Sequence, residues 1–184
     1  MCRHILIIGK NYEKKLIYKF LNQSIIKKNT PYINSKNDVD YHKDGFGLSW
    51  IKNNKWLTYK NKNCYINDKN IDNIINDINS NILIGHIRAK SPNNTIVNFD
   101  NTHPFQYKNN IWCHNGCISK LNDFKNEIVN NIDTNLKKNI KGTTDSEILF
   151  HLFLNFYLMK KKSTIENLIN TSIDFFSIIN KKKY

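Results

Sequence analysis

Short runs of hydrophobic residues alternate with polar segments along the first half of the chain. Arg3–Ile8 is an apolar run with the length of a buried strand, and Asn81–Ala89 is a second such run. Gly45–Ile51 and Lys55–Tyr59 are separated by the pair Asn53-Asn54, which is typical of a hairpin turn. These four runs predict a β-sheet that begins close to the N-terminus.

Other segments place hydrophobic residues three or four positions apart, which is the spacing of one helix face. This spacing predicts helices over Tyr12–Ile26, Ile71–Ile78 and Leu121–Ile132. The strongest helical signal is the apolar stretch Asp145–Met159. It opens with Thr144–Glu147, a Thr-x-x-Glu capping box, so we expect a well-defined helix start there.

The remaining segments are predicted as loops and short strands. Asn29–Lys43 and Ser91–Thr102 are predicted as loops, and Lys160–Lys162 suits the end of the preceding helix. Ile111–Ile118 is predicted as a strand that an Asn-Gly turn dipeptide interrupts, and Ser172–Ile179 as a final β-like stretch. The pattern is that of a mixed α and β chain, and 184 residues suit a single domain.

The formal net charge of +13 first suggests a partner with negative charge, such as a nucleic acid. Lysines are scattered along the chain, however, and lysine greatly outnumbers arginine, which nucleic-acid recognition favours. An AT-rich coding sequence explains the abundance of asparagine, lysine and isoleucine equally well. We therefore expect weak, salt-sensitive adhesion to polyanions and no specific nucleic-acid partner.

Hydrophobic runs in this chain are too short for a membrane span. None approaches the ~20 residues that a transmembrane helix needs, and the apolar run after Arg3 is too short for a signal peptide. We therefore expect a cytoplasmic protein that has no membrane partner.

The four cysteines are Cys2, Cys64, Cys113 and Cys117. Nothing marks the chain as secreted, so free thiols are expected rather than disulfides. Two of the cysteines flank His114, but a structural zinc site usually combines two pairs of ligands, and the sequence has no second pair. We expect neither a metal nor another cofactor.

Cys2 follows the initiator methionine, and removal of Met1 would make it the first residue. Its thiol and a free α-amine would then belong to the same residue. An α-amine has a pKa near ~7.7–8.0, so part of it is unprotonated at neutral pH and acts as a base for the nucleophile. Position alone also allows Cys2 to be a small buried hydrophobic residue.

Several short motifs occur in a fixed order along most of the chain. They are Met1-Cys2-Arg3, Asn22-Gln23-Ser24, Asp44-Gly45-Phe46-Gly47, Gly85-His86-Ile87-Arg88-Ala89-Lys90-Ser91, Asn101-Thr102-His103-Pro104-Phe105, His114-Asn115-Gly116 and Thr143-Thr144-Asp145-Ser146-Glu147. In this order they resemble the class II glutamine amidotransferase domain, a member of the N-terminal-nucleophile hydrolases. The nearer resemblance is to a stand-alone branch that includes the γ-glutamyl hydrolase of ergothioneine synthesis and the amidotransferase subunit of a glutathione-degrading complex.

The resemblance implies hydrolysis of the side-chain amide of glutamine, or of a γ-glutamyl bond, through a thioester on Cys2. The Asn115 side chain and the backbone N–H of Gly116 match the oxyanion hole of the family. Losing one such donor typically costs ~2.7–4 kcal/mol of transition-state stabilisation. Taken alone, an Asn-Gly pair is an ordinary turn.

The resemblance also assigns residues to the amino-acid end of the substrate. Arg88 matches the residue that binds the α-carboxylate, and Asp145 matches the residue that binds the α-ammonium. Arg88 also suits a surface ion pair at a strand end, and Asp145 also suits the first turn of a helix. His86 and His103 lie in matching motifs, and we expect them to order the loops around the pocket.

The fold implied is α+β, a four-layer αββα sandwich that is shortened at its C-terminus. A single domain is expected over 1–184, or over 2–184 once Met1 is removed. Because the chain has no synthetase domain, we expect either a simple amidase or a subunit that works with an ammonia-accepting or complex-forming partner. Two alternatives stay open: a catalytically idle copy that acts as a binding or regulatory subunit, and a basic nucleic-acid-associated protein.

Overall fold

The computed structural model describes residues 2–25, 42–90, 96–118, 121–159 and 165–181. The chain divides into two compact units, with the boundary between Asn115 and Gly116. Most of the loop predicted over Asn29–Lys43, part of the loop over Ser91–Thr102, and the lysines at 160–162 lie outside the described residues.

The first unit is built on an antiparallel sheet of four strands in the order β1-β4-β2-β3. The strands are β1 (Arg3–Ile8), β2 (Phe46–Lys52), β3 (Lys55–Asn61) and β4 (Ile82–Ile87). All four were predicted from the sequence. The β2–β3 hairpin turns at Asn53 and Asn54, whose φ values of 53° and 59° lie in the left-handed region that asparagine tolerates.

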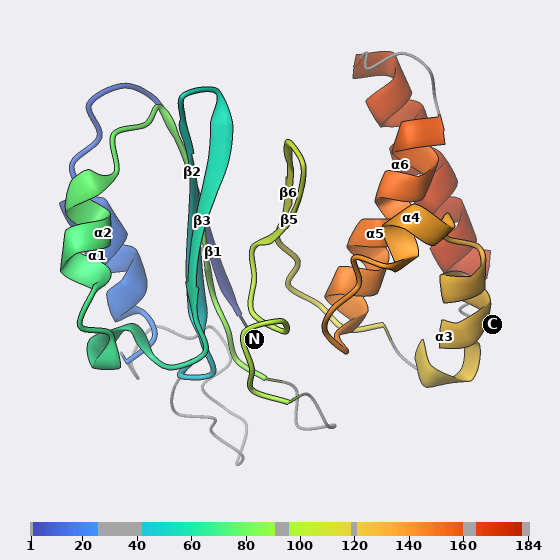
Figure 1. Ribbon diagram of the computed structural model, residues 1–184, viewed down its shortest axis with the longest axis horizontal. Coiled ribbons are helices and arrows are strands. Elements are labelled where there is room, and N and C mark those ends of the chain that lie inside the picture. Colours follow the sequence, from blue (N-terminus) through green and yellow to red (C-terminus); the bar gives the residue numbers. More distant parts are fainter. Residues whose placement is uncertain (1, 26–41, 91–95, 119–120, 160–164, 182–184) are drawn as a thin grey trace. The chain divides into compact units, whose positions relative to one another are not determined.

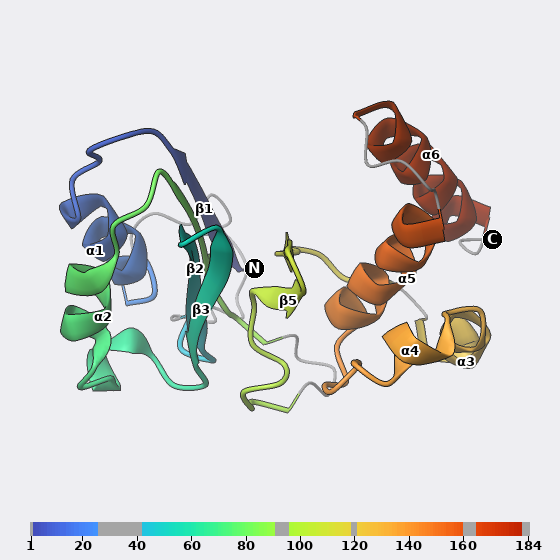
Figure 2. The same cartoon turned by 45° about the horizontal axis from the view of Figure 1, so that its top comes forward.

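Two helices cover one face of this sheet, α1 (Lys15–Asn22) and α2 (Ile71–Asp77), as Figures 1 and 2 show. A short 3-10 helix at Tyr65–Asn67 precedes α2. The core on this face contains Ile17, Phe20, Leu48 and Leu83. Gly85 on β4 is required there, because a Cβ atom would lie 2.7 Å from the Phe20 ring.

The opposite face of the sheet carries a short hairpin, β5 (Phe105–Tyr107) and β6 (Asn110–Trp112). The chain before β5 lies so close to the sheet that a Cβ atom at Gly47 would collide with the carbonyl of His103.

The strand predicted over Ile111–Ile118 is wrong in extent. Its pairing stops at Trp112, and the chain continues without regular structure to Ile118.

The second unit is helical in its described part, with α3 (Leu121–Asn130), α4 (Thr134–Lys137), α5 (Asp145–Met159) and α6 (Ile165–Lys181). Helix α5 has the predicted bounds, and α3 is shorter than predicted by two residues at its end. Phe153 of α5 packs edge-on against Phe175 of α6, with ring centroids 5.8 Å apart.

The β-like stretch predicted at Ser172–Ile179 is wrong, because these residues belong to α6. Isoleucine favours strands through its branched Cβ atom, and the segment carries several isoleucines. The buried side chains Thr171 and Phe175 are four positions apart, which is the spacing of a helix face. Packing of that face outweighs the local preference for a strand.

Candidate active site

Cys2 and Asn115 are joined by a reciprocal pair of hydrogen bonds in the first unit. The backbone N–H of Cys2 donates to Asn115 Oδ1, and Asn115 Nδ2 donates to the carbonyl of Cys2, each over 3.2 Å. Cys2 lies directly before β1, and Asn115 follows β6 by three residues. Asn115 and Gly116 lie in a stretch without regular structure, so the ordinary turn considered for this pair is not formed.

The Cys2 thiol lies against the backbone of Ala89. The Ala89 N–H donates to Sγ over 3.4 Å, and the Ala89 carbonyl accepts from the thiol over 3.5 Å. Burial raises the pKa of the thiol above 9.0, and the hydrogen bond with Ala89 lowers it in part. The thiol is therefore protonated at neutral pH, and its use as a nucleophile requires a base.

Arg88 directly follows β4, which ends at Ile87, and it is buried, with 3% exposure. Both Nη1 and Nη2 donate to the carbonyl of Ile96, each over 3.2 Å. Burial lowers the pKa of the guanidinium, and Asp44 and Cys2 raise it. Arg88 therefore does not form the surface ion pair considered from the sequence; it is a buried cation next to the Cys2 thiol.

The rings of His86 and His103 stack on each other, with centroids 4.1 Å apart. His4 adds a third ring, 4.9 Å from His86. The ring nitrogens of His86 and His103 have no hydrogen-bond partner among the described residues. Burial lowers the pKa of both rings well below 6.5. His4 lowers the pKa of His86 further, and His86 lowers the pKa of His103 further. Both rings are therefore neutral at pH 7.

Asp145 begins α5 in the second unit. Its Oδ2 accepts from the backbone N–H of Ile118 over 2.9 Å, and its Oδ1 accepts from the N–H of Ser146 over 2.8 Å. Asp145 thus binds the backbone two residues after Gly116. Gly116 itself is exposed. The structure brings Cys2, Arg88, Asn115, His86 and His103 together in the first unit, whereas Gly116 and Asp145 belong to the second.

The capping box predicted at Thr144–Glu147 is only half formed. The N–H of Glu147 donates to Thr144 Oγ1 over 3.3 Å. The buried Glu147 carboxylate accepts instead from the backbone N–H groups of Lys141 and Gly142, over 2.9 and 2.6 Å. Glu147 therefore stabilises the loop that leads into α5 rather than the first residue of the helix.

Asp44 was given no chemical role in the sequence analysis. In the structure its carboxylate accepts from the N–H of Lys90, next to the Cys2 contact. The sequence signal for this contact was the pair Asp44-Gly45. In the structure Gly45 has a φ of +119°, a conformation that favours glycine.

The cysteines are neither paired with one another nor gathered into a metal site in the part of the chain that the structure describes. All four cysteines are free thiols, and burial raises the pKa of Cys113 to about 12. Among the described residues, no group of three His, Cys, Asp or Glu side chains is arranged to hold a metal ion. No helix in the described ranges has the length and apolar character needed to cross a membrane.

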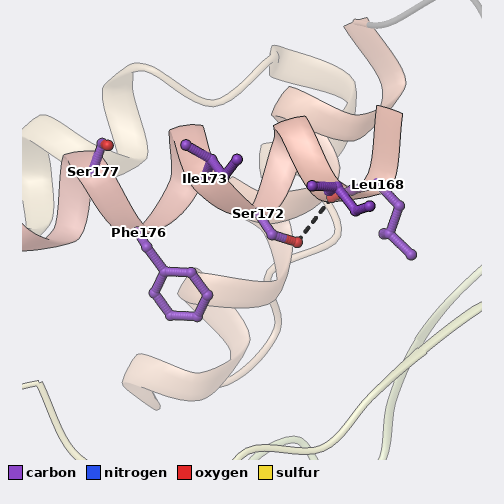
Figure 3. Close-up of a pocket in the computed structure, with 6 residues that line it drawn as sticks. Leu168, Ser172, Ile173, Phe176 and Ser177 are labelled. Atoms are coloured by element: carbon purple, nitrogen blue, oxygen red, sulfur yellow. Dashed lines mark hydrogen bonds between the residues drawn. The ribbon is translucent and has the colours of Figure 1, made fainter. Parts of the chain in front are cut away.

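The second unit carries two apolar hollows that contain none of the predicted site residues. One, of about 560 Å³, lies on α6 (Figure 3) and is lined by Leu168, Ile169, Ser172, Ile173, Phe176 and Ser177. The other, of about 430 Å³, lies between α3 and α5 and is lined by Glu127, Ile128, Asn131, Leu152, Asn155, Phe156 and Met159.

Comparison with known proteins identifies the family. Residues 21–183 match the sequence model of the class II glutamine amidotransferases. The chain belongs to this family. The chain is 35% identical over 74 residues to the probable glutamine amidotransferase DUG3 of Saccharomyces cerevisiae, a match that covers 40% of the chain and 20% of the yeast protein.

Two solved structures share the fold of this chain. A class II domain protein from Silicibacter pomeroyi has a TM-score of 0.55 and 24% identity, over 70% of this chain and 53% of its own. The glutamine phosphoribosylpyrophosphate amidotransferase of Bacillus subtilis has a TM-score of 0.56 and 16% identity, over 93% of this chain and 32% of its own. They confirm the predicted mixed α and β fold. The chain spans a fifth to about half of the length of these relatives.

Proposed function

We propose that this chain hydrolyses the side-chain amide of glutamine, or a γ-glutamyl bond, with Cys2 as the nucleophile. The observation that carries the proposal is the reciprocal hydrogen bonding between the Cys2 backbone and the Asn115 side chain. The donor group of the Asn115 carboxamide lies beside the residue that we propose as the nucleophile. Membership in the amidotransferase family supports glutamine as the substrate class.

The reaction starts after removal of Met1, which turns the Cys2 backbone nitrogen into an α-amine. The amine takes the thiol proton, and Sγ attacks the amide carbon to form a tetrahedral intermediate. The Asn115 carboxamide has two N–H donors. One is used by the Cys2 carbonyl, and we assign the other, with the N–H of Gly116, to the oxyanion.

Collapse of the intermediate breaks the carbon–nitrogen bond, and the protonated α-amine gives its proton to the departing ammonia or amine. This leaves a thioester on Cys2, which water hydrolyses to release glutamate and the free thiol. In this scheme Arg88 binds the α-carboxylate and Asp145 binds the α-ammonium. A guanidinium binds a carboxylate in a bidentate manner, which suits a buried arginine such as Arg88.

The relatives suggest two further parts of the proposal. We propose that an ammonia-accepting or complex-forming protein partner works with this domain, in keeping with its membership in the amidotransferase family. We also propose a cytoplasmic location, in agreement with four free thiols. The competing function is an idle amidotransferase-like subunit that binds glutamine without cleaving it.

The test is release of ammonia and glutamate by the purified protein, after intact mass has shown loss of Met1. The substrates are glutamine and γ-glutamyl dipeptides. We expect turnover in the wild type and none in Cys2→Ala. Turnover that is equal in both proteins would contradict the role of Cys2, and glutamine binding without turnover in the processed protein would favour the idle subunit.

A further inference from the structure

The segment Arg88–Lys90 is held by the two residues that precede β2. The N–H of Arg88 donates to the carbonyl of Gly45 over 2.8 Å, and the N–H of Asp44 donates to the carbonyl of Arg88 over 3.2 Å. These bonds extend the β2–β4 ladder beyond the Phe46–Ile87 pair. The Asp44 carboxylate adds a third bond, because Oδ2 accepts from the N–H of Lys90 over 2.8 Å.

Ala89 lies between these anchors and contacts the nucleophile. Its N–H donates to Cys2 Sγ over 3.4 Å. Arg88, on one side of Ala89, carries the buried guanidinium, and Lys90, on the other side, is bound by the carboxylate of Asp44. One residue, Asp44, therefore holds both ends of the peptide that contacts the thiol.

Gly45 explains how Asp44 reaches Lys90. The φ of Gly45 is +119°, and a Cβ atom there would lie 2.9 Å from the carbonyl oxygen of Asn61 and 3.0 Å from Thr102 Oγ1. A side chain at position 45 would be strained and would clash with two neighbouring segments. The backbone around Gly45 is thus shaped by tertiary contacts, and this fixes the direction of the Asp44 carboxylate.

We propose that Asp44 is a positioning residue for the amide hydrolysis, because it holds the Arg88–Lys90 segment against Cys2. In this role Asp44 keeps the Ala89 N–H directed at Sγ and keeps the Arg88 guanidinium beside the substrate carboxylate. The inference rests on the proposed function for its catalytic consequence. The placement of Asp44 beside the thiol does not depend on it.

The charge of Asp44 gives the placement an independent readout. Burial is the largest cause of the raised pKa of Cys2. The hydrogen bond with Ala89 and the charge of Arg88 lower this pKa, and the charge of Asp44 raises it. Replacing Asp44 by Asn keeps an acceptor for Lys90 and removes the negative charge. The pKa of the Cys2 thiol should therefore fall in Asp44→Asn.

The experiment compares Asp44→Ala and Asp44→Asn with Asp77→Asn, an exposed carboxylate paired with Lys52. All proteins are matched for Met1 removal by intact mass and for folding by thermal unfolding. Glutaminase activity is measured as kcat/KM. The rate of Cys2 alkylation by iodoacetamide is measured against pH, with the modified peptide identified by mass.

We expect Asp44→Ala to lose about tenfold or more in kcat/KM, because small displacements at a reacting centre are costly. Asp44→Asn should stay within about threefold of the wild type, since its Oδ1 atom still accepts from Lys90. Its alkylation midpoint should shift to lower pH, and Asp77→Asn should match the wild type in both measurements.

Unchanged kcat/KM in Asp44→Ala, or an equal loss in both Asp44 variants, overturns the positioning role. An unmoved alkylation midpoint in Asp44→Asn also overturns it, and this measurement decides the matter if Asp44→Ala does not fold. Failure of the proposed function is seen separately, as a processed wild type that releases no glutamate while the alkylation midpoints still differ.

Discussion

The backbone of Cys2 and the side chain of Asn115 exchange two hydrogen bonds across 113 positions of sequence. The first residue of the processed chain is therefore fixed to the segment proposed to stabilise the oxyanion. An Asn carboxamide serves both partners at once, because its oxygen accepts from the Cys2 nitrogen and its NH₂ group has two donors. Replacing Asn115 should therefore affect the catalytic step more than substrate binding.

Asn115→Ala should lower kcat for glutamine hydrolysis by about 10²–10³-fold, with a smaller change in KM. The oxyanion exists only in the transition state, so the donor contributes little to ground-state binding. Steady-state kinetics measure both constants. Asn139→Ala, an asparagine of the second unit that bonds only to a nearby carbonyl, is the control. A raised KM with unchanged kcat in Asn115→Ala would show that Asn115 binds substrate instead.

Arg88→Lys should raise the KM for glutamine by about tenfold, because an ammonium cannot replace the bidentate fork of a guanidinium. The comparison substrate is 4-aminobutanamide, which lacks the α-carboxylate of glutamine. Wild type and Arg88→Lys should cleave this amide with equal kcat/KM. If the variant loses as much on this amide as on glutamine, Arg88 acts through the carbonyl of Ile96 and not through the substrate.

The buried pair His86 and His103 should make the first unit sensitive to acid. Their pKa values lie well below 6.5 in the folded state because the rings are buried, whereas the unfolded chain titrates near 6.5. The stability is therefore complete above pH 6.5 and is lost as the pH falls below it. The loss is about 1.4 kcal/mol per pH unit for each proton taken up on unfolding.

Thermal unfolding at pH 7.5 and 5.0 measures this effect in the wild type and in His103→Phe. Phenylalanine keeps a ring against His86 and Phe105 but removes one titrating group. The variant should lose less stability between the two pH values than the wild type. An identical pH dependence would show that His103 is already charged or solvated in the folded protein.

Glu147→Ala should destabilise the second unit by about 2–3 kcal/mol, because the backbone N–H groups of Lys141 and Gly142 lose a charged acceptor. Glu147→Gln should cost less, since one oxygen remains. Urea unfolding gives the free energy of unfolding, and the exposed Glu166→Ala serves as the matched control. A Glu147→Ala protein as stable as this control would contradict the role assigned to the carboxylate.

The sequence predicted those parts of the fold whose signals are local. The strand Arg3–Ile8, the turn at Asn53-Asn54 and the helix Asp145–Met159 each follow from residues within one segment. The second half of helix α6 was wrongly predicted as a strand, because the strand preference of its isoleucines competes with a helical spacing that only packing decides. The pairing β5–β6 was missed because each strand has three residues, too few to show a pattern.

The long-range contacts in the site could not be predicted from local sequence patterns. The motifs pointed to Cys2, Arg88 and Asn115, and the structure brings these residues into one region. Nothing in the sequence indicated that Arg88 binds the carbonyl of Ile96 or that Asp44 binds Lys90, because each contact depends on how distant loops meet at a strand end.

The most direct test of the account is covalent capture of Cys2 by 6-diazo-5-oxo-L-norleucine, a diazoketone that mimics glutamine. The processed wild type should gain one adduct, located on Cys2 by peptide mass mapping, and excess glutamine should slow its formation. Cys2→Ser should gain none. Protein that keeps Met1 should react far more slowly, because its Cys2 nitrogen is an amide and cannot act as the base. An adduct on Cys113 or Cys117, or none on processed protein, would contradict the assignment of Cys2 as the nucleophile.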